Sequence, residues 1–116
     1  MAGENLEIHG ACAVSNATGT PAYTFNSGIF TGTIVDNGVG DYQLALNAND
    51  GFLAAECSCI LTNRTVPHAP RQCHHALVHT SPTSKQVLST EEAAAGAASI
   101  AADLDFDLVV VKRKFV

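Results

Sequence analysis

The segment Gly38-Val39-Gly40-Asp41-Tyr42-Gln43-Leu44-Ala45-Leu46 decides the fold of this chain. Two glycines make a turn, and every second residue from Tyr42 onward is apolar, which places these side chains on one face of a strand. The same alternation recurs in residues 53–62 and 104–111. These segments predict a compact all-β domain.

Further strands are expected where β-branched and aromatic residues lie between turns made of Gly, Pro, Asn and Ser. Asp36-Asn37-Gly38 predicts a tight hairpin turn. Residues 90–102 are rich in alanine without an apolar helical face, so we expect a loop that could include one helical turn. The absence of a βαβ pattern then favours one domain over residues 1–116, an antiparallel β-sandwich or jelly-roll-like barrel of about eight strands. The other expected strands are residues 6–14, 22–25, 28–36, 41–47, 73–80 and 85–89.

Charge is sparse in this chain. Only 15% of its 116 residues are charged and 47% are apolar, against about 25% charged residues in an average domain. A surface of small neutral side chains suits packing against other copies or a larger assembly. The net charge of −5 argues against nucleic-acid binding, which uses Lys and Arg to neutralise phosphates. The basic run Lys112-Arg113-Lys114 is interpreted as a solvated strand end.

No stretch approaches the roughly 20 apolar residues of a membrane helix. The first residues, Met1-Ala2-Gly3-Glu4-Asn5, lack the basic start and apolar core of a signal peptide. We therefore expect that the protein is synthesised in the host cytoplasm and that it does not associate with a membrane.

Cysteine and histidine residues form a cluster in the sequence, made of Cys57, Cys59, Cys73, His75 and His79. If two adjacent strands carried them, their thiolates and imidazoles could bind zinc. The spacing matches no familiar zinc motif, so we favour buried cysteines and strand histidines and expect no metal or cofactor. A Cys12–Cys73 disulfide stays open at this point, although a reducing cytoplasm disfavours it.

Catalytic signals are weak. Ser81 or Cys73 could act as a nucleophile with His79 as its base, but the sequence contains no Gly-x-Ser-x-Gly nucleophile elbow. Asp103, Asp105 and Asp107 recur at every second residue; they could hold a hard cation, and we favour a solvated strand face. We therefore expect that the protein is not an enzyme.

Residues 28–35 and 37–46, with the closing strand Asp105-Phe106-Asp107-Leu108-Val109-Val110-Val111, resemble small β-sandwich modules of tailed-bacteriophage virions. The resemblance spans residues 28–113. It implies a structural virion protein without catalytic residues, commonly a homotrimer, such as a capsid decoration protein, a head-fibre or spike head, or a tail-fibre tip. The four cysteines and the Cys73-His74-His75 triplet depart from these modules.

Three functions follow. The first is a capsid decoration (cement) protein that binds a major capsid or other virion protein as a homo-oligomer; the expected contacts are Ile60, Val109 and Val111, and one of the two valines must face away from the core. The second is a receptor- or glycan-binding tip that uses residues 63–72, although Tyr23 and Tyr42 are the only rings suited to sugars. The third is a small Cys/His metal-binding module. Fold alone does not choose among them.

Overall fold

The computed structural model describes residues 4–16, 20–64 and 72–115. These residues form nine strands and one short 3₁₀ helix. The strands are β1 (Glu4–Ser15), β2 (Ala22–Asn26), β3 (Phe30–Gly38), β4 (Asp41–Leu46), β5 (Cys57–Asn63), β6 (Cys73–Ser81), β7 (Ser84–Glu92), β8 (Ser99–Ala101) and β9 (Phe106–Phe115), and the helix is η1 (Ala48–Asp50).

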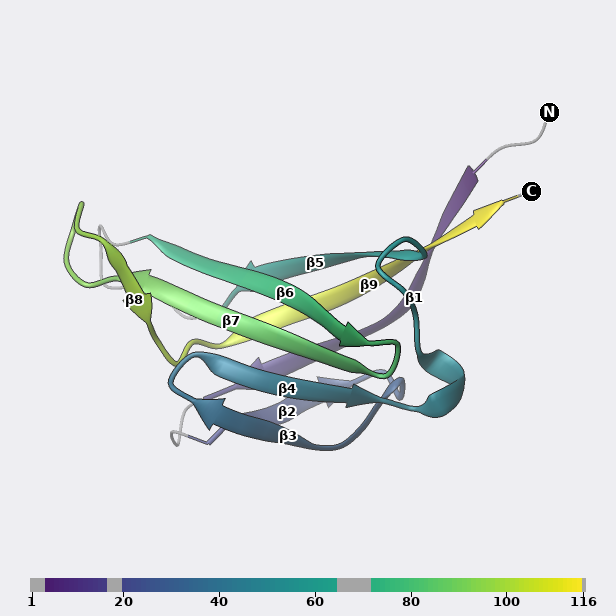
Figure 1. The fold of residues 1–116 in the computed structure, drawn as a ribbon, viewed down its shortest axis with the longest axis horizontal. Coiled ribbons are helices and arrows are strands. Elements are labelled where there is room, and N and C mark those ends of the chain that lie inside the picture. Colours follow the sequence, from purple (N-terminus) through teal and green to yellow (C-terminus); the bar gives the residue numbers. More distant parts are fainter. Residues whose placement is uncertain (1–3, 17–19, 65–71, 116) are drawn as a thin grey trace.

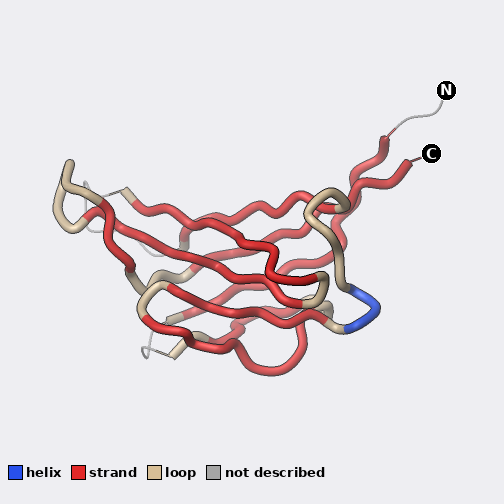
Figure 2. The backbone as a smooth tube through the Cα atoms, in the orientation of Figure 1, coloured by secondary structure: helices blue, strands red, loops and turns tan. Residues whose placement is uncertain are grey.

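The strands form two antiparallel sheets packed face to face, so the expected β-sandwich is confirmed (Figure 1). The first sheet has the order β2-β1-β9-β5, and the second has the order β3-β4-β7-β6, with β8 pairing the far end of β7. Figure 2 shows how little of the backbone lies outside these strands. The sheets approach each other at both margins, where β5 lies near β6 and β2 near β3.

The core lies between the two sheets and follows from alternation along the strands. In β4 every second residue is buried, and Tyr42 and Leu44 are fully so. In β9 the inward residues are Phe106, Leu108 and Val110. The Phe106 ring stacks on Tyr42 at 5.9 Å between centroids, which joins the two sheets.

A seam of polar contacts holds the loop before β9 against the start of β4. Asp103 accepts hydrogen bonds from the Gly40 amide (2.9 Å) and from the Tyr42 hydroxyl (2.7 Å). The Ser89 amide donates to the Gly40 carbonyl (2.8 Å), and the Ala102 amide donates to the Ser89 carbonyl (3.1 Å). Gly40 is therefore held through its amide by Asp103 and through its carbonyl by Ser89.

The hairpin between β3 and β4 differs from the expected position. β3 continues through Gly38, and the turn lies at Val39–Gly40. Asn37 has no positive φ, whereas Gly38 and Gly40 do (φ 137° and 67°). The hairpin is therefore formed, but its turn lies two residues later than the expected Asn37-Gly38, where Gly40 contacts Asp103 and Ser89.

The strand expected over residues 53–62 begins only at Cys57. The preceding residues form a turn, in which the Leu53 amide donates to the Glu56 carboxylate (2.6 Å) and the Glu56 amide donates to the Leu53 carbonyl (3.0 Å). Leu53 is consequently exposed, and Phe52 takes the buried position beside the core. The alternation expected over residues 53–62 therefore holds only from Cys57 onward.

The alanine-rich stretch is a hairpin rather than a loop. β7 extends to Glu92, the chain turns at Gly96 (φ 74°), and β8 pairs back with Thr90↔Ala101. Alanine favours neither face of a sheet, so this pairing left no periodic signal.

Candidate interaction surface

The outer face of the first sheet carries the residues expected to make contacts. Ile60 of β5 pairs with Val109 of β9, and Val109 pairs with Ala11 of β1. Val111 pairs with Ile8 on the same face. Both valines point away from the core, because residues two apart in a strand share a face, and Val110 between them is fully buried.

Large exposed hydrophobic side chains extend this face toward the chain ends. Leu6, Ile8, Phe25 and Ile60 are all at least half exposed (66%, 73%, 56% and 51%). A β-bulge at His9 places Ile8 and Ala11 on the same face although they are three residues apart. We call this surface, made of Leu6, Ile8, Ala11, Ala13, Phe25, Ile60, Val109 and Val111, the apolar face.

A groove lies at one end of the apolar face. Its volume is about 520 Å³, and Ala11, Ala13, Phe25 and Val109 are among its lining residues. Its polar wall is Arg64, whose Nε lies 3.5 Å from the Asp107 carboxylate and whose Nη1 lies 3.4 Å from the Thr24 hydroxyl. The groove thus combines an apolar floor with a half-exposed ion pair.

The outer face of the second sheet mixes polar side chains with two exposed valines, Val35 and Val78 (54% and 41%). Gln86 donates to the Asp41 carboxylate (2.7 Å), and Gln43 donates to the Ser84 and Thr80 hydroxyls. These side chains satisfy one another across β4, β6 and β7. The two outer faces therefore differ in chemistry, and a partner that covers apolar surface would be expected at the first sheet.

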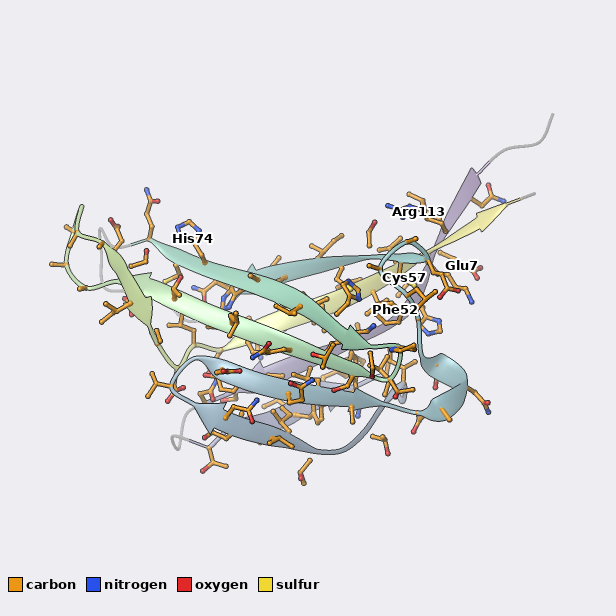
Figure 3. All side chains as sticks on the ribbon, viewed as in Figure 1. Glu7, Phe52, Cys57, His74 and Arg113 are labelled. Carbon is orange, nitrogen blue, oxygen red and sulfur yellow. The ribbon has the colours of Figure 1, made fainter. Side chains whose placement is uncertain are left out.

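β1 and β9 continue beyond the rest of the sandwich as a two-stranded ribbon. Their ladder runs from Val14↔Phe106 to Glu4↔Phe115, whereas β2 reaches only Cys12 and β5 only Lys112. Figure 1 shows this terminal ribbon, residues 4–6 with 113–115, projecting with both chain ends at its tip. Figure 3 shows Arg113 on the ribbon beside the sandwich, where it donates to the Ala55 carbonyl (2.9 Å) and the Ser58 hydroxyl (3.0 Å).

The Cys/His cluster is split between two ends of the sandwich. His75 lies beside Ser89 (Nδ1–Oγ 2.7 Å) and Asn63 (Nε2–Oδ1 3.1 Å), and its ring contacts Phe106 at 5.5 Å between centroids. Burial lowers the pKa of His75. His75 is therefore a half-buried histidine that faces Phe106 and has a partner at each ring nitrogen.

His79, Cys57 and Cys59 lie at the other end, around Lys85. The Lys85 side chain is 1% exposed, and its ammonium donates to the Phe52 carbonyl (2.6 Å) and the Ser81 carbonyl (2.9 Å). The ammonium also lies 4.1 Å from the centroid of the Phe52 ring, a cation–π contact; Figure 3 shows Phe52 and Cys57 close together at this end. Burial lowers the pKa of Lys85.

Cys12 and Cys57 are buried among the core side chains, and Cys59 and Cys73 are partly buried. Burial raises the pKa of Cys12 to about 12 and that of Cys59 to about 11, so neither is a thiolate at neutral pH. All four cysteines are free, so the Cys12–Cys73 disulfide is not formed. Within residues 4–16, 20–64 and 72–115, no three His, Cys, Asp or Glu side chains come together as metal ligands.

The three aspartates do not share a strand face, which corrects the expected arrangement. Asp103 and Asp105 precede β9, and each accepts hydrogen bonds from another part of the chain: Asp103 from Gly40 and Tyr42, and Asp105 from the Asn16 amide (2.7 Å). Asp107 points outward to Arg64.

The expected sugar-binding rings are not available for stacking. Tyr42 is fully buried, and the Tyr23 hydroxyl is enclosed without a hydrogen-bond partner among the described residues. Phe25 is the exposed ring beside the groove. Most of residues 63–72, the expected binding loop, lies outside the described residues.

The burial of Lys85 was not predicted, although the sequence contains a signal for it. Lys85, Val87, Ser89 and Glu91 alternate with residues of the opposite face, and all four are buried. The alternation that identifies Val87 as a core residue therefore also places Lys85 inside.

No family model, curated protein or solved structure matches this chain. Among the described residues, no helix has the length and apolar character needed to cross a membrane.

Proposed function

We propose that this protein is a structural, non-catalytic virion protein that assembles with copies of itself through the apolar face and decorates the capsid of a tailed bacteriophage. The observation that carries the proposal is the contrast between the two outer faces. The apolar face exposes the large side chains of Leu6, Ile8, Phe25 and Ile60, whereas the second sheet exposes two smaller ones, Val35 and Val78, among amides and hydroxyls that bind one another. Exposed apolar patches of this kind mark protein contacts.

The virion part of the proposal is supported by the resemblance of residues 28–113 to virion β-sandwich modules. A low charge content fits a surface that is covered in an assembly. Co-sedimentation with emptied capsids of the phage that encodes the protein tests this part. Saturable binding is expected, and free protein at all capsid concentrations would contradict it.

Self-association is tested by Ile60→Lys, with Val78→Lys as the matched control. Both side chains are exposed (51% and 41%) and lie mid-strand, Ile60 on the apolar face and Val78 on the outer face of the second sheet. A charge at Ile60 would have to be desolvated in the contact, which costs several kcal/mol. Ile60→Lys should dissociate the oligomer in native mass spectrometry while its circular dichroism stays unchanged, and Val78→Lys should remain assembled. Equal behaviour of the two variants would refute the assignment of the face.

A second candidate, glycan binding, is favoured by the groove. An exposed ring, Phe25, stands beside the Arg64–Asp107 pair and the Thr24 hydroxyl, and a sugar could stack on such a ring while its hydroxyls bind the charged groups. Glycan-array binding that is lost in Phe25→Ala and retained in Val39→Ala, on the β3–β4 turn, would favour this function. An array without any hit would exclude it for the sugars tested.

A further inference from the structure

On the apolar face, large and small side chains lie at matching distances on opposite sides of one centre. Along β1 its outward residues are Leu6 and Ile8, then, after the bulge, Ala11 and Ala13. The two large side chains are therefore on one side of Gly10, and the two small ones are at an equal distance on the other side. Gly10 pairs with Val110 of β9 and marks the centre.

The neighbouring strand carries a matching pattern of charge. Arg113 pairs with Leu6, and Asp107 pairs with Ala13. The basic residue and the acidic residue thus lie on opposite sides of the same centre, each three residues from Val110. Val111 and Val109 flank Val110 on the outer face.

We propose, on the basis of the self-association above, that the partner of the apolar face is a second copy, packed face to face about a two-fold axis that crosses the strands at the Gly10–Val110 pair. Such an axis lays β1, β5 and β9 on the same strands of the partner, running in the opposite direction. β2 pairs only with residues 12–15 of β1 and lies to one side of this contact. Leu6 then faces the partner's Ala13, Ile8 faces the partner's Ala11, and the terminal ribbon of each copy lies over the groove of the other. Isologous contacts of this kind close on themselves as a dimer.

Charge complementarity supports this register. Arg113 of each copy lies over Asp107 of the other, where Arg64 already pairs with Asp107. Packed sheets cross at about 30°, and at about 10 Å from the axis this moves a side chain sideways by about 5 Å, close to one strand spacing. The flexible arginine side chain spans this offset. A parallel arrangement would instead bring like charges together.

The size of the face is also suited to a stable pair. The strands that overlap their partner copies, β1, β5 and β9, contain 29 residues, which at about 3.3 Å rise and about 4.8 Å strand spacing cover a flat area of about 460 Å². With the corrugation of the side chains, a pair buries about 1,000 Å² in total, the lower limit of specific interfaces. A two-stranded ribbon is marginally stable alone. Docking covers the terminal ribbon and would therefore stabilise it.

Cysteine cross-linking tests the register directly. Chains carrying Ile8→Cys are mixed with chains carrying Ala11→Cys, and disulfide formation is followed under mild oxidation by non-reducing electrophoresis. The mixture should give a cross-linked dimer. Each variant alone should not, because its new thiol faces an Ile8 or Ala11 that is unchanged in the partner. Native mass spectrometry of the unaltered protein should show a dimer rather than the trimer common among the modules that the sequence resembles.

A charge exchange gives an independent measurement. Arg113→Asp and Asp107→Arg should each weaken dimerisation by about 100-fold, because each places like charges together at two symmetric positions, and the double variant should regain at least about 10-fold. An oligomer that Ile60→Lys dissociates, but that shows neither the mixed cross-link nor the regain, would overturn the two-fold register and leave the proposed self-association standing. A monomer at all concentrations would overturn both.

Discussion

Replacing Gly40 by alanine tests how the glycine turn is held in the fold. Gly40 has a φ of 67°, and a Cβ added there would lie 2.3 Å from the Ser89 carbonyl oxygen and 2.9 Å from the Ala102 amide nitrogen. Both neighbours are backbone atoms, so no side-chain rotation can relieve the overlap. Gly96→Ala is the matched control, because Gly96 has a similar φ (74°) and nothing within 4 Å of its added Cβ.

The magnitude follows from two contributions. The left-handed conformation costs an alanine about 1–2 kcal/mol, and the stiffer unfolded chain returns about 0.4–1 kcal/mol, so Gly96→Ala should lose about 0.5–1 kcal/mol. At Gly40 the overlap must also separate the turn from Ser89, which sacrifices the Ser89 N–H to Gly40 bond and the Ala102 N–H to Ser89 bond. At about 1 kcal/mol each, the total loss is about 3 kcal/mol.

Urea unfolding followed by circular dichroism measures both variants, at one protein concentration and with the oligomeric state checked. Gly40→Ala should lose at least about 2 kcal/mol more than Gly96→Ala. If the two losses agree within about 0.5 kcal/mol, conformational strain accounts for both, and the seam around Gly40 does not hold the turn as argued.

Three further predictions concern buried polar groups. Tyr42→Phe should lower the free energy of unfolding by about 1.5 kcal/mol, since it removes a hydrogen bond to the Asp103 carboxylate; an unchanged urea midpoint would contradict it. Burial lowers the pKa of His75 and His79 below 6.5, so the unfolded chain takes up protons first as the pH falls. Stability should therefore fall below about pH 6.5, by at most about 1.4 kcal/mol per pH unit for each histidine, and His75→Gln should show a shallower decline; parallel profiles would argue against this. Cys59, with a pKa of about 11 against 9.0, should react with iodoacetamide at pH 8 about 100-fold more slowly in the folded protein than in urea, as measured by peptide mass spectrometry, and equal rates would place it at the surface.

Strand alternation carried most of the sequence-based prediction. It identified β4 and β9 because apolar residues at every second position leave one consistent inner face. It also placed Ile60 on an outer face, which the structure confirms by its pairing with Val109. These features depend on neighbours in the sequence, and local pattern is sufficient for them.

Features set by distant contacts were not predictable in the same way. The turn at Gly40 depends on Asp103, and no local signal links residues 63 apart. The start of β5 depends on a side-chain cap by Glu56 that competes with the strand pattern. Three residues of the apolar face, Ile60, Val109 and Val111, were predicted from the sequence. Leu6, Ile8 and Phe25 were not, because only the pairing of β1 with β2 and β9 places them on this face.

The ribbon joins the two chain ends in space, since Glu4 and Phe115 are paired neighbours, about 5 Å apart as in any antiparallel ladder. Segments fused to either end would consequently leave the domain from one point and travel in one direction. The domain could be inserted into a loop of another protein without stretching that loop. A linker of a few residues could likewise close the chain into a ring, so that new ends could be opened at the exposed η1 turn.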